Sequence, residues 1–358
     1  RSGDTVARLG GDEFGIILDD LAKPEYAQRL ADTILQTLHQ PLATGAALIH
    51  TSGSIGLTIS PLDGEDPHAL LTNADLAMYR AKDAGGDQVI RYFEAMSQRE
   101  RERADLESDL LDGLHGGEFT VAYQPQVRIS DRRTVRLEAL ARWPHRKRGN
   151  VPPDQFIQVA EDAGLINPLG MAVLVQCCRD AHLFKNTNGE RVKIAINVSA
   201  SQLRLPEFAT QFLNTITQFG HSPQDFEVEI TETVFADDEL HFHQAISTFE
   251  TAGVALAIDD FGTGFSNLNR LRQLPVAALK LDISLIRGLP GTRDERAIAE
   301  AAIAMSKHLG FESVAEGVET YAQLDFLRDI GCDSAQGFLF SRPLSADDTV
   351  TWLKSGSN

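Results

Sequence analysis

The feature that most constrains the fold is an alternation of short β-rich runs with longer helical runs. It begins near Gly116 and continues for about 245 residues, which is the size and rhythm of a TIM-type (β/α)8 barrel. A doubly wound open sheet is the alternative, but no GxGxxG follows a first strand. The expected strands are 136–140, 192–197, 226–230, 254–259, 278–281, 313–316 and 333–338, and the expected helices are 171–184, 207–219, 240–252, 294–309 and 321–330.

Polar residues stand at the carboxyl ends of these predicted strands. In a barrel, such ends open onto one face, where active sites lie. Gathered carboxylates repel one another and lose hydration, and divalent cations resolve that conflict. Oxygen ligands with an amide among them suit Mg²⁺ or Mn²⁺, and a two-metal site is expected. The residues are Glu138, Asn197, Glu229, Asp259 with Asp260, Lys280 with Asp282, Glu316 and Gln336.

Two residues of this set indicate what chemistry the site could perform. Lys280 is a cation among acids, and it either neutralises its neighbours or acts on a phosphate oxygen or a water. Glu316 could serve as the general base for a water that attacks a phosphodiester. On spacing alone, a metal-dependent lyase or aldolase on the same barrel is a further alternative, which the motifs described below disfavour.

Composition excludes several classes of protein. With 33 basic and 51 acidic residues the chain has a net charge of −18, which disfavours binding to nucleic acid or an anionic membrane through bulk charge. Cys177, Cys178 and Cys332 show no metal-ligand spacing, and their odd number fits a reducing cytoplasm. We expect no membrane span and no signal peptide in this fragment, and leave open membrane attachment of a longer parent protein.

The first 114 residues follow a different pattern. Residues 1–93 begin with two apolar runs joined by a turn, which predicts a hairpin, and continue with helices at about 24–39 and 70–81 and a strand-like run at 47–59. This segment resembles half a domain. Residues 94–114 are predicted to form a charged linker helix with an apolar stripe made by Leu106, Leu110, Leu111 and Leu114.

The predicted barrel contains the string Glu138-Ala139-Leu140-Ala141-Arg142 and a series of further short motifs over about 115–345. These strings resemble the signature and motifs of the EAL family of cyclic di-GMP phosphodiesterases, and they run in the family's order. Together they are specific, although each string alone is weak. They are YQP at 123–125, NVS at 197–199, EITE at 229–232, DDFGTG at 259–264, KLD at 280–282, AEGVE at 315–319 and QG at 336–337.

The resemblance implies a barrel that hydrolyses cyclic di-GMP to linear 5′-pGpG with Mg²⁺ or Mn²⁺ in bacterial signalling. The metal ligands would be Glu138, Asn197, Glu229, Asp259 and Asp260. Glu316 matches the family's proposed general base, and Lys280 matches the residue that holds the catalytic water. No matched ligand or base is missing, so a working enzyme is expected, with a catalytically silent cyclic di-GMP receptor as the alternative.

The resemblance also implies residues that contact the substrate and residues that support the site. Gln124, Leu140, Arg142 and Gln336 resemble substrate-binding or active-site positions, and the Arg142 guanidinium suits phosphate oxygens. Glu232 resembles the anchor of the loop 260–267, with Asp282 and Glu319 as further support. The family also implies a homodimer through the EAL domain, with residues 115–358 forming that domain.

The first segment contains the string Gly10-Gly11-Asp12-Glu13-Phe14 in the turn of its predicted hairpin. This string resembles the signature of GGDEF diguanylate cyclases, so the segment is similar to the C-terminal half of such a domain, and Arg1 with Asp4 matches the family's inhibitory product site. Ser54-Ile55-Gly56 and 74–79 are also family-like. The family's upstream metal and nucleotide elements are missing from this sequence, so cyclase activity is not expected of it.

Overall fold

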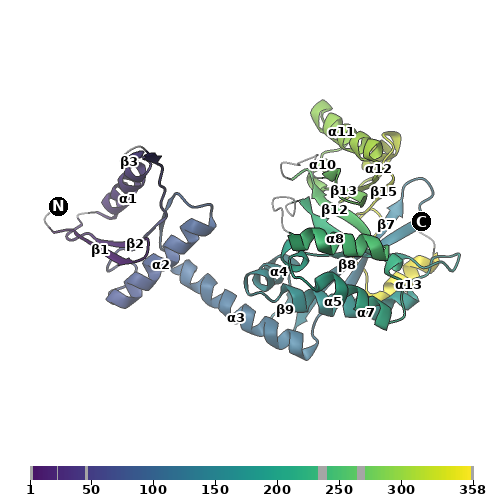
Figure 1. Cartoon of the computed structure of the whole chain (residues 1–358), viewed down its shortest axis with the longest axis horizontal. Coiled ribbons are helices and arrows are strands. Elements are labelled where there is room, and N and C mark those ends of the chain that lie inside the picture. The colour runs from purple at the N-terminus through teal and green to yellow at the C-terminus, as the bar shows by residue number, and fades with distance from the viewer. Residues whose placement is uncertain (1–2, 22, 45–46, 233–239, 264–270, 356–358) are drawn as a thin grey trace. The chain divides into compact units, whose positions relative to one another are not determined.

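The computed structural model describes residues 3–21, 23–44, 47–232, 240–263 and 271–355. Contacts divide the chain into two compact units, Arg1–Asp105 and Leu106–Asn358, and each unit is described by itself. The elements of both are labelled in Figure 1. In the described part of the chain, no helix combines the length and the apolar character that a membrane crossing requires.

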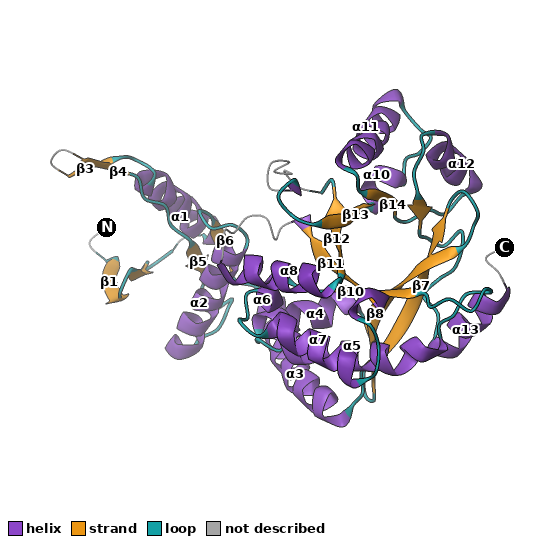
Figure 2. Ribbon diagram, turned by 45° about the vertical axis from the view of Figure 1, so that its right-hand side comes forward, coloured by secondary structure: helices purple, strands orange, loops and turns teal. Residues whose placement is uncertain are grey.

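The second unit is a closed barrel, which confirms the predicted fold class. Within the described residues, eight strands form its wall, because β10 pairs with β8 as well as with β11. Figure 2 shows the ring of strands with the helices outside it. The strands are β7 (Thr120–Arg128), β8 (Thr134–His145), β10 (Lys193–Asn197), β11 (Phe226–Thr231), β12 (Ala255–Phe261), β13 (Val276–Leu281), β14 (Glu312–Ala315) and β15 (Ser334–Ala335).

One strand departs from the all-parallel arrangement of a TIM barrel. β7 runs antiparallel to both of its neighbours, β8 and β15, whereas the other barrel pairs are parallel. The predicted strands left β7 out, and the predicted run 333–338 is in fact a strand of two residues, Ser334–Ala335. β9 (Gly149–Val151) pairs with the end of β8 outside the barrel wall.

Helices cover the outside of the barrel and bury its main core. Apolar residues of the strands that point outward, such as Ile194, Val228 and Leu279, pack with the helices in one large cluster. Several helices begin with capping boxes, as at Thr292 and Thr320. The helices are α4 (Pro153–Asp162), α5 (Ile166–Asp180), α6 (Ala200–Leu203), α7 (Phe208–Gln218), α8 (Leu240–Ala252), α10 (Ile283–Ile286), α11 (Arg293–Leu309), α12 (Tyr321–Asp329) and α13 (Ala346–Ser355), with 3-10 turns at Ala181–Leu183 and Pro223–Asp225.

The first unit contains the predicted hairpin. β1 (Thr5–Gly10) pairs antiparallel with β2 (Glu13–Ile17), and Gly11 in the turn has a φ of 51°. The predicted strand over 47–59 is wrong as one element, because the polar residues around Gly53 separate β4 (Ala47–Ile49) from β5 (Ile55–Leu57). The remaining elements are α1 (Pro24–Leu38), β3 (Leu42–Thr44), α2 (Pro67–Asp83) and β6 (Val89–Arg91).

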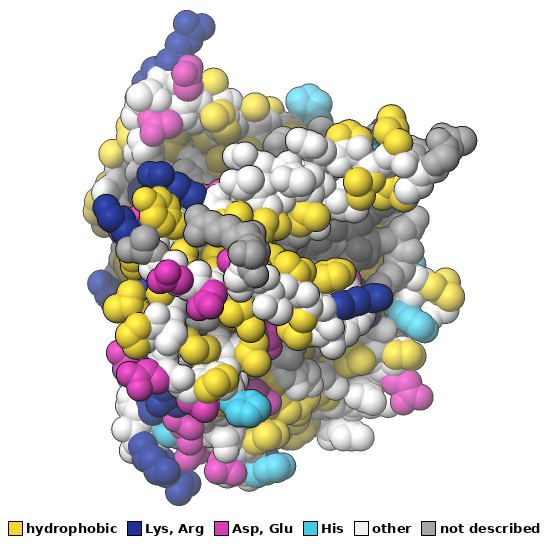
Figure 3. All heavy atoms as spheres, turned by 90° about the vertical axis from the view of Figure 1, so that its left-hand side faces the viewer, with side chains coloured by type: hydrophobic (Ala, Val, Ile, Leu, Met, Phe, Trp, Pro, Cys, Tyr) yellow, Lys and Arg dark blue, Asp and Glu magenta, His cyan; other side chains and the backbone are white. Residues whose placement is uncertain are grey.

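The core of the first unit is small. Its fully buried side chains are mostly alanines, such as Ala77 and Ala81 on α2. Several large apolar side chains of the hairpin are exposed, including Leu9 at 62%, Phe14 at 64% and Ile17 at 65%. Hydrophobic side chains also lie among charged ones on the molecular face drawn in Figure 3. The hairpin therefore offers apolar surface that the unit itself does not cover.

Helix α3 (Glu94–Gly116) is the charged helix predicted between the two patterns. Leu106 and Leu110 are buried in a second core cluster with Trp143 and Phe156, and Leu114 packs against it. Leu111 does not belong to the buried stripe, because its side chain is 40% exposed. The C-terminal half of α3 is thus part of the barrel unit, and Gly113 allows the Trp143 indole to approach closely.

Candidate active site

On two strands of the barrel, β8 and β11, alternation places polar side chains inside the ring and apolar ones outside. On β8, Arg136 and Glu138 are buried among polar partners, whereas Leu137 and Ala139 belong to the core under the helices. On β11, Glu227 and Glu229 alternate in the same way with Val228. β8 and β11 therefore each contribute polar side chains at two levels of the barrel, two residues apart.

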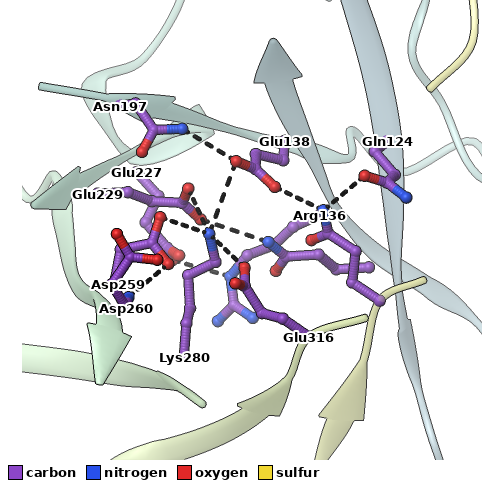
Figure 4. A network of polar contacts seen from close by, with 12 residues as sticks. Gln124, Arg136, Glu138, Asn197, Glu227, Glu229, Asp259, Asp260, Lys280 and Glu316 are labelled. Carbon is purple, nitrogen blue, oxygen red and sulfur yellow. Dashed lines mark hydrogen bonds and ion pairs between the residues drawn. The ribbon is translucent and has the colours of Figure 1, made fainter. Parts of the chain in front are cut away.

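At the upper level, toward the carboxyl ends of the parallel strands, Lys280 lies among four carboxylates. Its Nζ is 2.8 Å from Glu229 Oε2, 3.0 Å from Asp259 Oδ2 and 2.8 Å from Glu316 Oε1. Glu138 Oε1 is slightly farther away, at 3.7 Å. Figure 4 shows these carboxylates converging on Lys280 from different strands. The predicted acids on β8, β11 and β12 and directly after β14 are thus brought together around the lysine of β13.

The acids form two groups that could each hold a cation. Ligand oxygens of Glu138, Glu229 and Asp259 lie within 4.8 Å of one another, and so do those of Asp259, Asp260 and Glu316. Asp259 is the member that both groups share. Five carboxylates around one ammonium leave an excess of negative charge, which divalent cations with oxygen ligands would balance.

The pKa shifts of the site residues reflect the same excess of negative charge. Burial raises the pKa of Glu316 to about 8, and the charges of Asp259 and Glu138 add to this against the opposing effect of Lys280. Burial likewise raises the pKa of Glu229 despite Lys280, and burial with the charge of Asp259 raises the pKa of Asp260. Burial alone would lower the pKa of Lys280, but the surrounding carboxylates together raise it.

Side-chain amides lie beside the carboxylate group formed by Glu138, Glu229 and Asp259 and contact Glu138. Asn197 donates from Nδ2 to Glu138 Oε1 over 2.9 Å. Gln336 donates from Nε2 to Glu138 Oε2 over 2.5 Å and to Gln124 Oε1 over 3.0 Å. The Oε1 atom of Gln336 is buried and has no hydrogen-bond partner among the described residues. An unpaired amide oxygen beside these carboxylates fits a site for a hard cation.

A cleft of about 400 Å³ opens above these groups, within the range of small-molecule sites. Asp282 lines it, but its side chain accepts from Ser284 N over 2.9 Å and caps α10. Glu319 also lines it, at the start of the turn into α12. The lining residues are Gln124, Glu138, Asp259, Asp260, Asp282, Ile283, Glu316, Gly317, Glu319, Gln336, Gly337 and Phe338.

The backbone after Asp259 is unusual. Asp260 has a φ of 56°, in the left-handed region that non-glycine residues seldom adopt, and its N–H bonds to Asp259 Oδ1 over 2.9 Å. Glu232, which is buried, accepts from Gly262 N over 3.3 Å and so ties the loop that follows β12 to the end of β11. Residues 264–267 of the predicted loop lie outside the described residues.

The two remaining predicted substrate contacts lie farther along β8. The two-residue period puts Leu140 and Arg142 on the same side of the strand as Glu138. Both are half-buried, and Arg142 donates from Nη1 to the carbonyl of Ala141. The structure therefore places them beyond the carboxylates, toward the open end of the strand.

The lower level of the barrel holds polar residues that the sequence analysis missed. Arg136 donates from Nε to Glu227 over 2.8 Å and from Nη2 to Glu312 over 2.5 Å. Gln126, on β7, donates to Glu229 Oε1 over 3.3 Å and thereby joins the two levels. Arg136, Glu227 and Gln126 each stand two positions from a predicted site residue on the same strand, so the two-residue period was the available signal for them. Glu312 stands four positions before Glu316.

The predicted signature of the first unit forms the turn of its hairpin. Arg8 donates from Nε to the carbonyl of Gly11 over 2.9 Å, and Asp12 and Glu13 are exposed there. Asp4 lies just before β1, and Arg1 is outside the described residues. Gly56 on β5 is required by packing, because a Cβ there would collide with the backbone of Ala74 and Met78 on α2.

Comparison with known families agrees with this arrangement. The model of the EAL domain matches residues 107–343, and that of the diguanylate cyclase GGDEF domain matches residues 1–88. The chain therefore belongs to the EAL-domain family and carries a partial GGDEF domain ahead of it.

Curated relatives match nearly all of the chain. The bifunctional diguanylate cyclase/cyclic di-GMP phosphodiesterase MucR of Pseudomonas aeruginosa is 36% identical over 98% of this chain and 51% of its own length. The cyclic di-GMP phosphodiesterase PdeR of Escherichia coli is 34% identical over 98% of this chain and 52% of its own. The chain thus spans about half the length of these relatives.

Solved structures of EAL domains share the barrel. The PaMucR phosphodiesterase in complex with c-di-GMP has a TM-score of 0.64 and 36% identity, and the match covers 68% of this chain and 99% of that one. The EAL domain of Mycobacterium smegmatis DcpA has a TM-score of 0.58 and 31% identity, over 67% of this chain and 99% of the other.

Proposed function

We propose that this chain hydrolyses cyclic di-GMP to linear 5′-pGpG in a reaction that requires Mg²⁺ or Mn²⁺. The observation that carries the proposal is the pair of carboxylate groups that share Asp259 at the carboxyl end of the barrel. The phosphodiesterase names of the relatives and the c-di-GMP bound to the PaMucR structure support the choice of substrate.

The residues that would hold the metal ions are Glu138, Asn197, Glu229, Asp259 and Asp260. When bound there, a pair of divalent ions supplies positive charge that neutralises the phosphodiester and stabilises its attacking and leaving oxygens. Asn197 and Gln336 hold Glu138 through hydrogen bonds to its two oxygens, so this ligand is oriented from both sides.

The chain's own groups would carry the proton. Glu316 lines the cleft and is the proposed general base that takes a proton from the attacking water. Lys280 donates to the Glu316 carboxylate over 2.8 Å and would orient both the base and its water. Gln124 would contact the substrate from the cleft wall, and Leu140 and Arg142 from the open end of β8, where a guanidinium suits a phosphate oxygen.

The proposal is tested by product analysis. The protein is incubated with c-di-GMP and Mg²⁺ or Mn²⁺, and the products are identified by mass spectrometry. We expect 5′-pGpG from the wild type, no product after metal removal with EDTA, and a loss of about 10²–10⁴-fold in rate for Glu316→Gln. Tight binding of c-di-GMP without product would overturn the proposal and identify a receptor.

The family resemblance further suggests a cytoplasmic homodimer assembled through the EAL domain. Sedimentation analysis of the chain and of residues 94–358 tests that state directly. A monomer at all concentrations would reject it without affecting the proposed reaction.

A further inference from the structure

The wall of the cleft includes one aromatic side chain, Phe338, which has no role in the proposed reaction. Phe338 lines the cleft among carboxylates and amides, and its side chain is 49% exposed. The carboxylates, the amides and the lysine of the site would bind metal ions, a water and a phosphodiester. An exposed aromatic ring at the same cleft suits the flat, apolar part of a ligand instead.

The backbone that carries Phe338 is held firmly. A Cβ at Gly337 would collide with the backbone of Val318, so only glycine permits this close approach. The Leu339 N–H donates to the carbonyl of Val318 over 3.0 Å, and the Val318 N–H donates to the carbonyl of Gln336 over 3.0 Å. The ring is thus displayed on a turn whose position is fixed relative to the end of β14.

Arg342 braces the ring. Its guanidinium carbon lies 4.3 Å from the centroid of the Phe338 ring, which is a cation–π contact. The same turn is tied to the neighbouring strand β7, because Gln124 donates from Nε2 to the carbonyl of Ser341 over 3.1 Å. The positive charge of Arg342 also favours a phosphate-bearing ligand near the ring.

We propose that Phe338, braced by Arg342, is a stacking platform for a purine base of a cyclic dinucleotide. This rests on the proposed function, because it takes the phosphodiester to be held at the carboxylates below. Phe338 follows Gln336 by two residues, so their Cα atoms are at most about 7 Å apart. A nucleoside joined to a phosphate beside Gln336 therefore has the ring within its reach.

Stacking on an aromatic ring supports affinity for the base but not the chemistry at phosphorus. Removing the ring should therefore raise KM and Kd for c-di-GMP by about 5- to 150-fold. Phe338→Tyr and Phe338→Trp keep a stacking surface and should stay within about threefold of the wild type. Phe219→Ala, which removes a 40% exposed phenylalanine at the end of α7, is the matched control.

The experiment separates binding of the base from chemistry at phosphorus in the metal-loaded protein. For c-di-GMP, KM and kcat are measured on Phe338→Ala, and Kd is measured by calorimetry in a Glu316→Gln background. Because the ring contacts the base and not the reacting atoms, Phe338→Ala should raise KM and leave kcat at saturating c-di-GMP unchanged.

Two results would overturn the platform. One is an unchanged KM and Kd for c-di-GMP in Phe338→Ala, and the other is a fall in kcat as large as the rise in KM. Failure of the proposed function is distinct, because the wild type would then bind c-di-GMP without turnover. The calorimetric comparison of wild type with Phe338→Ala still decides the stacking in that case.

Discussion

Gln126 donates a hydrogen bond to one oxygen of Glu229 over 3.3 Å, while Lys280 holds the other oxygen at 2.8 Å. Both donors are buried, so the Glu229 carboxylate is fixed in one orientation by two different strands, β7 and β13. Outer hydrogen bonds of this kind orient a metal ligand.

Gln126→Leu should therefore weaken metal binding without unfolding the barrel. We expect the Mn²⁺ concentration for half-maximal activity to rise by about 10- to 100-fold, as for the loss of other outer hydrogen bonds. Gln158→Leu on the exposed face of α4 is the control. An unchanged Mn²⁺ activation curve for Gln126→Leu would show that Glu229 does not need this donor.

Asp259 is the residue common to both carboxylate groups, so its loss should affect both cation sites. Calorimetric titration of the wild type with Mn²⁺ should report two ions, and Asp259→Asn should lose more affinity than the roughly 10- to 100-fold cost of removing an outer partner. Asp131→Asn, an exposed carboxylate in the β7–β8 turn, serves as the comparison. Wild-type stoichiometry in Asp259→Asn would refute the shared-ligand arrangement.

The buried ion pairs at the lower level of the barrel should matter for stability. Arg136→Met leaves Glu227 and Glu312 without their cation, and breaking such a buried network costs about 3–5 kcal/mol of the free energy of unfolding. Arg128→Met removes an exposed pair with Asp131 and should cost less than about 1 kcal/mol. Urea denaturation measures both, and equal effects would contradict the assigned role of the lower level.

Glu312 gives this network a pH dependence. Burial favours its neutral form, but hydrogen bonds and charge from Arg136 outweigh burial and lower its pKa below the usual 4.5. Because the folded-state pKa is depressed, the stabilisation is complete above pH 4.5 and is lost as the pH falls through the folded-state value. In urea titrations the wild type should exceed Glu312→Gln at pH 7 and converge with it at acidic pH. A constant difference at all pH values would contradict this.

The upper level of the site was predictable because parallel strands end on one face. Glu229 and Asp259 lie near the carboxyl ends of β11 and β12, and that position brings them together. Glu138 was expected at the end of a strand over 136–140, but it lies in the middle of β8, which continues to His145. The four contacts of Lys280 depend on side-chain reach across the barrel, which no linear pattern contains.

β7 was missed for a physical reason. The sequence of β7 contains Gln124, Pro125 and Gln126. Glutamine and proline are uncommon inside strands, so this sequence does not predict one. It enters the barrel antiparallel, so its site residues lie in its middle rather than at its carboxyl end. Gln124 nevertheless pairs in register with Glu138, which explains its place in the site.

The central claim is that the carboxylates around Asp259 support metal-dependent hydrolysis of c-di-GMP with Glu316 as the base. The most direct test is the initial rate of 5′-pGpG formation when Mn²⁺ is added back to EDTA-treated protein, for the wild type and Glu316→Gln. We predict that the rate returns with Mn²⁺ in the wild type, whereas Glu316→Gln binds c-di-GMP with little turnover. Wild-type protein that binds c-di-GMP but forms no product at any Mn²⁺ concentration would contradict the claim.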